Sequence, residues 1–173
     1  MTMIRPPHVD ELPRLQEIEV EAGRAFIDIG MPEVAGDDAL PLTELEAWRA
    51  AGRAWVVELE GTVEGYVVVD LLDGHAHVEQ VSVDPRHRGH RLGRDLLDHV
   101  AAWARGRGDA RVTLTTFREV PWNAPYYERC GYRVLADDER GPDLVARMQL
   151  EADHGLDPET RVAMALDLDP SAS

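Results

Sequence analysis

One segment, residues 78–97, constrains the fold of this chain more than any other. Its sequence is VEQVSVDPRHRGHRLGRDLL. Val78, Val81 and Val83 among polar residues predict a short β-strand, and Asp84-Pro85 ends that strand because proline cannot donate to a β-ladder. A glycine-bearing basic turn follows, and leucines then recur at helical spacing. A strand, a turn and a helix N-terminus in this order predict an anion cradle, because the first N–H groups of a helix are free to bind negative charge.

The charge of this segment contrasts with that of the whole chain. The chain has 18 basic and 33 acidic residues and a net charge of −15, whereas residues 86–94 hold four arginines and no acid. A local positive spot on an acidic protein fits a compact phosphorylated ligand. It argues against a nucleic-acid partner, which needs a broad basic face. The alternative is a surface turn with solvated arginines, since an isolated glycine loop is a weak signal.

Length and composition predict a single globular domain over residues 1–173, with residues 169–173 as a frayed tail. No apolar run reaches the roughly 18 residues that a membrane span needs, so no membrane partner is expected. The N-terminus lacks the apolar stretch of a signal peptide. Cys130 is the single cysteine, which excludes an internal disulfide and favours a cytoplasmic location. No metal-ligand spacing is present.

Hydrophobic periodicity predicts strands and helices in mixed order. Thr43 is expected to cap the second helix, with Glu46 as its capping-box partner, and Gly131 is expected to end the fourth. The expected strands cover residues 2–5, 55–59, 63–72, 75–83, 111–116, 132–135 and 161–168. The expected helices cover residues 12–25, 43–51, 92–106, 122–129 and 142–155, with a loop over 30–41.

Two motifs make the chain resemble the GNAT superfamily of acetyl-CoA-dependent N-acetyltransferases. The first is the R/Q-x-x-G-x-G/A loop, here Arg88-Gly89-His90-Arg91-Leu92-Gly93. Arg91 stands where the family usually has glycine, and the loop keeps its amides in place provided that Arg91 has a negative φ. The second is Asn123-Ala-Pro-Tyr-Tyr-Glu-Arg-Cys-Gly-Tyr132, which is similar to the family's late asparagine–tyrosine–glycine–aromatic signature.

The resemblance covers nearly the whole chain and implies the GNAT fold. This is an α+β, three-layer architecture with helices on a central sheet of about six to seven strands. The sheet is mixed, mostly antiparallel and splayed between its fourth and fifth strands. The resemblance also implies acetyl-CoA as co-substrate and no metal.

The implied coenzyme site has two parts. The cradle would bind the pyrophosphate through backbone amides and guanidinium groups. The main chain of the preceding strand would bind the pantetheine arm like an added strand, and an amide near Val81 or Ser82 would polarise the thioester carbonyl. Asn123 begins a helix that it is suited to cap, and in the family this residue often meets the coenzyme arm. The implied contacts are Val81, Ser82, Val83, Arg88, Gly89, His90, Arg91, Leu92, Gly93, Arg94, Asn123 and Tyr127.

Amine acetylation needs a base, because an alkylamine with a pKa of about 10 is mostly charged at pH 7. His77 and Glu79 share one face of the strand over 75–83 because side chains alternate. The resemblance implies one of these two as the base, with a slight preference for Glu79. It also implies Tyr127 as the proton donor to the departing thiolate, whereas Tyr126 and Tyr132 are expected to pack.

The acceptor is predicted only by class. Residues 1–50 hold eleven acids against four arginines, which would attract a small cationic amine, although solvated acids are ordinary on an acidic chain. An amine of a protein is an alternative acceptor. A catalytically idle acyl-CoA-binding module is the alternative function, but the set His77, Glu79 and Tyr127 favours an active enzyme. The oligomeric state stays open, a homodimer included.

Overall fold

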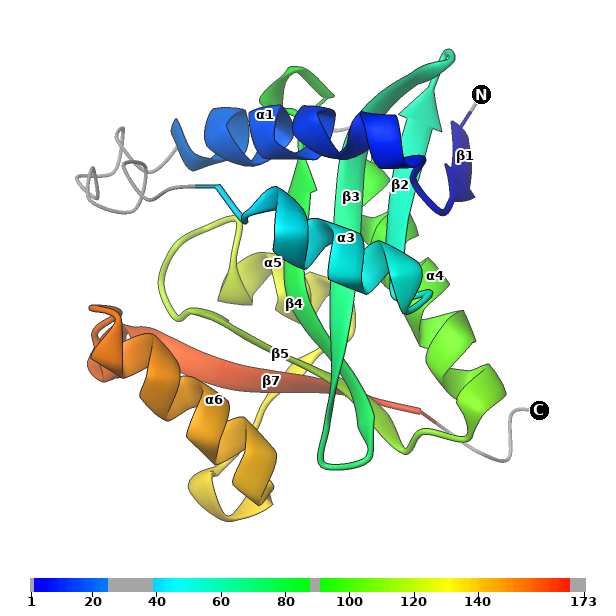
Figure 1. Ribbon diagram of the computed structural model, residues 1–173. Helices are drawn as coiled ribbons and strands as arrows, with labels where there is room; N and C mark the ends of the chain where they lie inside the picture. Colours follow the sequence, from blue (N-terminus) through cyan, green and yellow to red (C-terminus); the bar gives the residue numbers. More distant parts are fainter. Residues whose placement is uncertain (1, 25–38, 88–90, 169–173) are drawn as a thin grey trace. The chain divides into compact units, whose positions relative to one another are not determined.

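The computed structural model describes residues 2–24, 39–87 and 91–168. Seven strands form a sheet in the order β1-β2-β3-β4-β5-β7-β6. The pairs β1–β2, β2–β3 and β5–β7 are antiparallel, and β4–β5 is parallel (Figure 1). The two-residue strand β6 is antiparallel to β7. Helices flank the sheet. The predicted mixed and mostly antiparallel architecture is therefore confirmed.

Contacts divide the chain into two compact units. The first unit comprises Met1–Val69 and Gln80–His99, and the second comprises Asp70–Glu79 and Val100–Ser173. Three elements contribute residues to both units: β3 (Thr62–Leu72), β4 (His75–Val83) and α4 (Leu92–Arg107). The expectation of a single domain stays a prediction.

The first unit is built on a hairpin and two helices. β1 (Thr2–Arg5) pairs with β2 (Ala54–Leu59), and β2 pairs with β3. Glu60 and Gly61 turn the hairpin with φ values of 53° and 83°, the left-handed conformations that suit tight hairpins. The helices α1 (Leu12–Gly23) and α3 (Leu42–Ala50) follow β1 along the chain, with a 3₁₀ turn, Val9–Glu11, before α1. The core of this unit contains Leu12, Leu15, Ile18, Leu45, Val56, Tyr66 and Val68.

The predicted capping box of α3 is wrong. Pro41 is the N-cap, and its carbonyl accepts the N–H groups of Glu44 and Leu45 at 3.0 Å each. Thr43 therefore lies inside the first turn, where its hydroxyl is past the capping position. Glu46 instead accepts hydrogen bonds from the guanidinium of Arg49, one of them at 2.7 Å.

The second unit places a long β-ladder against a helix. β5 (Arg111–Phe117) and β7 (Arg161–Asp167) are antiparallel from Arg111↔Asp167 to Phe117↔Arg161. α5 (Ala124–Arg129) ends before Gly131, whose φ of 97° confirms the predicted helix stop. β6 (Arg133–Val134), α6 (Pro142–Asp153) and 3₁₀ turns at Asp137–Glu139 and Pro158–Thr160 complete the unit. Its core contains Leu72, Leu135, Leu144, Ala163 and Ala165, with Met148 packed against them.

The parallel ladder between β4 and β5 is short. It consists of Ala76↔Val112, His77↔Thr113 and Val78↔Leu114. β4 continues to Val83 and β5 continues to Phe117. The predicted splay between the fourth and fifth strands is confirmed, and the backbone of β4 leaves the ladder just before Glu79.

Across residues 2–24, 39–87 and 91–168, no helix combines the length and the apolar character needed to cross a bilayer.

Candidate active site

The end of β4 carries the predicted pantetheine contacts. Ser82 is buried, and Val81 and Val83 are half-buried. Gly65 on β3 lies close to this backbone: a Cβ at Gly65 would stand 3.1 Å from the Ser82 carbonyl oxygen and 3.0 Å from Val57 Cγ1. Glycine therefore lets β3 approach the end of β4. The coenzyme contacts of Val81, Ser82 and Val83 stay predictions.

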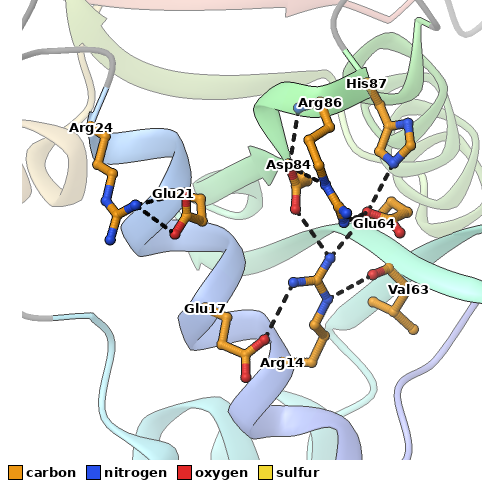
Figure 2. Close-up of polar contacts among 9 residues, drawn as sticks. All are labelled: Arg14, Glu17, Glu21, Arg24, Val63, Glu64, Asp84, Arg86 and His87. Carbon is orange, nitrogen blue, oxygen red and sulfur yellow. Dashed lines mark hydrogen bonds and ion pairs between the residues drawn. The ribbon is translucent and has the colours of Figure 1, made fainter.

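Two buried carboxylates, Glu64 and Asp84, anchor the turn that follows β4 (Figure 2). Arg14 Nη2 on α1 donates to Glu64 Oε2 at 3.0 Å and to Asp84 Oδ2 at 3.2 Å. Arg86 donates its backbone N–H and its Nε to Asp84 Oδ1 at 3.0 and 3.1 Å. His87 Nε2 lies 3.0 Å from Glu64 Oε2. The 3₁₀ turn Pro85–His87 is thereby attached to α1 and β3.

This anchoring changes the charge available to the cradle. Arg86 Nη2 also donates to Glu64 Oε2, at 3.2 Å. Burial raises the pKa of Asp84, but hydrogen bonds from Arg86 and Arg14 outweigh it and the net pKa is lowered. Asp84 is therefore ionised at neutral pH, and Arg86 neutralises it. Arg86 does not add free positive charge for a ligand, although the sequence counts it among the basic residues of 86–94.

The cradle itself is described in part. Arg88, Gly89 and His90 lie outside the described residues. Arg91 has a φ of 61°, so the expectation of a negative φ is wrong. The reason is that the motif has glycine at this position, and glycine enters the left-handed region without strain. At Arg91 the backbone therefore has the left-handed conformation that glycine favours, with an arginine in place of the glycine.

The first turn of α4 follows the cradle directly. Leu92 is buried and fixes the start of the helix in the core, and Gly93 and Arg94 are half-buried. Asp95 N–H donates to the Arg91 carbonyl at 3.0 Å. The first N–H groups of a helix have no acceptor within the helix, which suits this turn to bind an anion. The predicted roles of Arg91, Leu92, Gly93 and Arg94 stay predictions.

His77 and Glu79 are brought together on β4 in the second unit. His77 is 1% exposed and its Nδ1 lies 2.9 Å from Thr113 Oγ1. Burial, aided by the nearby Arg147 cation, lowers the pKa of His77 to about 3. A neutral imidazole with so low a pKa is a weak base. The Nε2 atom of His77 is 3.8 Å from Glu79 Oε2.

Glu79 has the opposite environment. Its side chain is 25% exposed and contacts Arg147 Nη1, which also donates to Asp70 Oδ2 at 2.9 Å. Burial raises the pKa of Glu79 to about 7, with Arg147 lowering it and the carboxylates of Asp70 and Glu151 raising it. A carboxylate with a pKa near the working pH is suited to general base catalysis.

A second ion pair lies beside this group. Thr115 Oγ1 on β5 donates to Glu151 Oε2 at 2.8 Å. Arg161 Nη2 lies 3.1 Å from Thr115 Oγ1 and 3.3 Å from Glu151 Oε1. The guanidinium carbon of Arg161 is 4.6 Å from the centroid of the Phe117 ring, a cation–π geometry. Glu151 and Arg161 therefore largely compensate each other.

Asn123 is the N-cap residue of α5, and Tyr127 lies one turn further along the helix. Desolvation raises the pKa of Tyr127 to about 12 despite the nearby Arg161 cation, so its hydroxyl keeps its proton at neutral pH. Asn123 does not cap α5 through its side chain, contrary to expectation, because its Oδ1 accepts from Thr116 Oγ1 at 2.7 Å. That bond ties α5 to the end of β5. The catalytic role of Tyr127 and the coenzyme contacts of both residues stay predictions.

Sequence reasoning missed the charged partners of Glu79. The sequence predicts Asp70 only as part of a strand, and Arg147 and Glu151 only as part of a helix. A signal was present, because Arg147 and Glu151 are four residues apart and so share one face of α6. That face borders Leu144 and Met148, which pack into the core. The sequence does not show which strand packs against α6, so the partners of this face could not be predicted.

Over the three described stretches of the chain, no group of three or more His, Cys, Asp or Glu side chains is arranged to hold a metal ion.

The first unit thus holds a strand, a turn and a helix N-terminus in succession, and the second unit holds a half-buried carboxylate on β4. The sequence matches the model of the Acetyltransferase (GNAT) family over residues 15–132. This is more than half of the chain, and the chain therefore belongs to the GNAT family of acetyltransferases.

Solved structures agree with this assignment at the level of the fold. The ribosomal-protein-S18-alanine N-acetyltransferase of Escherichia coli is 18% identical, with a TM-score of 0.66 over 98% of this chain and 95% of that one. The PaiA N-acetyltransferase of Thermoplasma acidophilum, in complex with coenzyme A, is 15% identical, with a TM-score of 0.66 over 97% and 99%. The N-acetylglutamate synthase of Neisseria gonorrhoeae, with coenzyme A and N-acetyl-glutamate, is 16% identical, with a TM-score of 0.72 over 98% and 35%.

Proposed function

We propose that this chain transfers an acetyl group from acetyl-CoA to a primary amine by direct attack within a ternary complex, with Glu79 as the general base. The observation that carries the proposal is the state of Glu79. This carboxylate lies where β4 leaves the ladder with β5, and its pKa is raised to about 7. His77 is two residues away but buried, with a pKa of about 3. Glu79 is therefore the better proton acceptor of the pair.

The proposed chemistry starts with the acceptor ammonium. Glu79 takes one proton from it, and the free amine then attacks the carbonyl carbon of the thioester. An amide N–H near Val81 or Ser82 stabilises the oxyanion that forms. When the C–S bond breaks, Tyr127 donates a proton to the thiolate, and the second nitrogen proton passes through solvent to the tyrosinate and restores it. Glu79 then releases its own proton to solvent. The products are the N-acetylated amine and the free thiol of coenzyme A.

Coenzyme binding is assigned to the end of β4 and to the start of α4. The main chain of Val81–Val83 is proposed to pair with the pantetheine arm. The first turn of α4, with Gly93 and Arg94, is proposed to hold the pyrophosphate. The anchored turn Pro85–His87 supports this, because it fixes the course of the backbone that enters the cradle.

The acceptor is proposed to be a small cationic amine. When Glu79 is ionised, the charged group around it holds three carboxylates, Asp70, Glu79 and Glu151, against two guanidinium groups, Arg147 and Arg161. One negative charge is left over, and an ammonium ion matches it. This supports an amine without an additional anion.

An amine-library screen tests the proposal. Release of free thiol from acetyl-CoA is followed for each amine, and thermal unfolding is recorded with and without coenzyme. We expect turnover with small alkylamines and a higher Tm with coenzyme A, as for any ligand specific to the native state. A raised Tm without turnover on any amine, small or in a peptide, would show an idle acyl-CoA-binding module. No rise in Tm at millimolar coenzyme would reject both readings.

A further inference from the structure

The guanidinium of Arg147 makes an unusual shared contact. A single nitrogen, Nη1, donates to Asp70 Oδ2 at 2.9 Å and also contacts Glu79 Oε2. The three side chains come from β3, β4 and α6 and are 21%, 25% and 23% exposed, respectively. One cation is thereby divided between two carboxylates, of which only Glu79 has a proposed role in proton transfer.

We propose that Arg147 and Asp70 are positioning residues that hold the Glu79 carboxylate in place and set its affinity for a proton through opposing charges. The inference rests on the proposed function of Glu79 as base. It adds two residues that no coenzyme or amine needs to touch. Arg147 favours the ionised form of Glu79, and Asp70 limits that effect because it competes for the same nitrogen and adds a like charge.

The fold holds Arg147 in register with Glu79. The carboxylate of Asp73, in the turn between β3 and β4, accepts the N–H groups of Asp143 and Leu144 at the start of α6, at 2.8 and 3.0 Å. In return, Asp143 Oδ2 accepts the N–H of Asp73 at 2.8 Å. A Cβ on Gly141 would lie 2.2 Å from the carboxyl carbon of Asp73, so this junction needs glycine. The hairpin that carries Asp70 and Glu79 is thus fastened to the helix that carries Arg147.

Among the residues that the structure describes, four charged or titratable groups face Glu79. Asp70 comes from β3, His77 from β4, and Arg147 and Glu151 from α6. His77 is neutral because its pKa is lowered to about 3. Glu151 is engaged by Arg161. Arg147 and Asp70 are therefore the pair that decides the balance.

The experiment is a direct titration of Glu79 that needs no acceptor. Side-chain carboxyl ¹³C shifts of glutamate-labelled protein are followed with pH by NMR, and the signal that disappears in Glu79→Gln is assigned to Glu79. We expect Arg147→Met to move the Glu79 midpoint to higher pH and Asp70→Asn to move it to lower pH, each by about one pH unit or more. Arg147→Lys should recover part of the first shift. Asp153→Asn, which removes an exposed charge on the same helix, should leave the midpoint unchanged.

The decline of kcat/KM at low pH, the acid limb of the profile, should shift along the pH axis in the same direction as the Glu79 midpoint in each variant. Below the limb the rate is proportional to the ionised fraction of the base, so a rise of one pH unit in the midpoint lowers the rate there about tenfold. Midpoints that stay fixed in both Arg147→Met and Asp70→Asn, or that move in the same direction, would overturn the inference. That result leaves the proposed function intact if Glu79→Gln still abolishes the limb. If Glu79→Gln keeps full turnover, it is the proposed function that fails.

Discussion

Asp84 in the first unit and Glu79 in the second are both carboxylates beside arginine, and their pKa values move in opposite directions. Burial raises the pKa of each. Asp84 also accepts a backbone N–H and hydrogen bonds from two arginines, and its net pKa is lowered. Glu79 has one arginine, which it shares with Asp70, and its pKa is raised to about 7. The direction of each pKa shift therefore follows the number of hydrogen-bond donors that the carboxylate has.

The difference separates a structural cluster from a reactive one. Asp84 stays ionised, and the cluster around it holds the turn Pro85–His87 against α1 and β3. The cluster around Glu79 is short of positive charge and exchanges a proton near neutral pH. Buried ion pairs are weak evidence of function by themselves. A carboxylate whose neighbours leave it under-compensated is stronger evidence.

The largest effect should come from removing the base. Glu79→Gln should lower kcat/KM at neutral pH by about 100–1000-fold, because general base catalysis contributes on that scale, and it should abolish the acid limb. The measurement is a pH–rate profile with an amine of low pKa, since the free-amine fraction of an ordinary alkylamine imitates the limb. His77→Ala should keep a limb. If Glu79→Gln retains the wild-type profile, Glu79 is not the base and its cluster is structural, like the cluster around Asp84.

The proton donor should give the next largest effect. Tyr127→Phe should lower kcat by about 10–1000-fold and leave coenzyme affinity nearly unchanged, because the substitution removes only the hydroxyl. Steady-state kinetics and calorimetry on the same preparation separate the two quantities. Tyr126→Phe is the matched control, as its ring centroid lies 5.5 Å from that of Tyr127. A larger loss in Tyr126→Phe than in Tyr127→Phe would mean that Tyr126, and not Tyr127, is the proton donor.

The two clusters should also give opposite pH dependences of stability. The folded-state pKa of Glu79, about 7, lies above its unfolded value of about 4.3. Its stabilising contribution is therefore complete below about pH 4.3 and is lost as the pH rises through 7, by about 4 kcal/mol. Urea unfolding of Glu79→Gln should lack this decline.

Asp84 has the reverse sign. Its folded-state pKa is lowered, so its contribution is present above the unfolded pKa of about 3.9 and is lost as the pH falls through the folded value. Asp84→Asn should reduce the free energy of unfolding at pH 7 by about 1–3 kcal/mol, because it leaves buried donors poorly matched. It should also flatten the acid-side decline. Parallel pH curves for Asp84→Asn and Glu79→Gln would refute the contrast.

The individual strands and helices were predictable from the sequence because their signals are local, whereas the sheet architecture was implied by the family resemblance. Alternation and the stop at Pro85 predicted β4 over its observed range, and the period of two placed His77 and Glu79 on one face. The cap of α3 was predicted wrongly because the Pro41 carbonyl accepts the first helical N–H groups, so α3 starts one residue before the predicted cap. The Glu79–Arg147 pair was out of reach, because a pattern along the chain does not tell which strand lies under a helix.

The smallest effect concerns the backbone of the cradle. Arg91 has a φ of 61°, and the left-handed region costs an L-residue about 1–2 kcal/mol. Glycine removes this strain but loses about 0.5–1 kcal/mol through the greater freedom of the unfolded chain. Arg91→Gly should therefore raise the free energy of unfolding by about 0.5–1 kcal/mol.

Arg91→Ala is the control for this prediction. It keeps the strain and removes the same charge, so the difference in stability between the two variants isolates the effect of the backbone. Urea denaturation measures that difference, and calorimetry with coenzyme A measures the contribution of the lost charge, which both variants share. An Arg91→Gly protein less stable than Arg91→Ala would mean that the cradle does not favour the left-handed conformation at this residue.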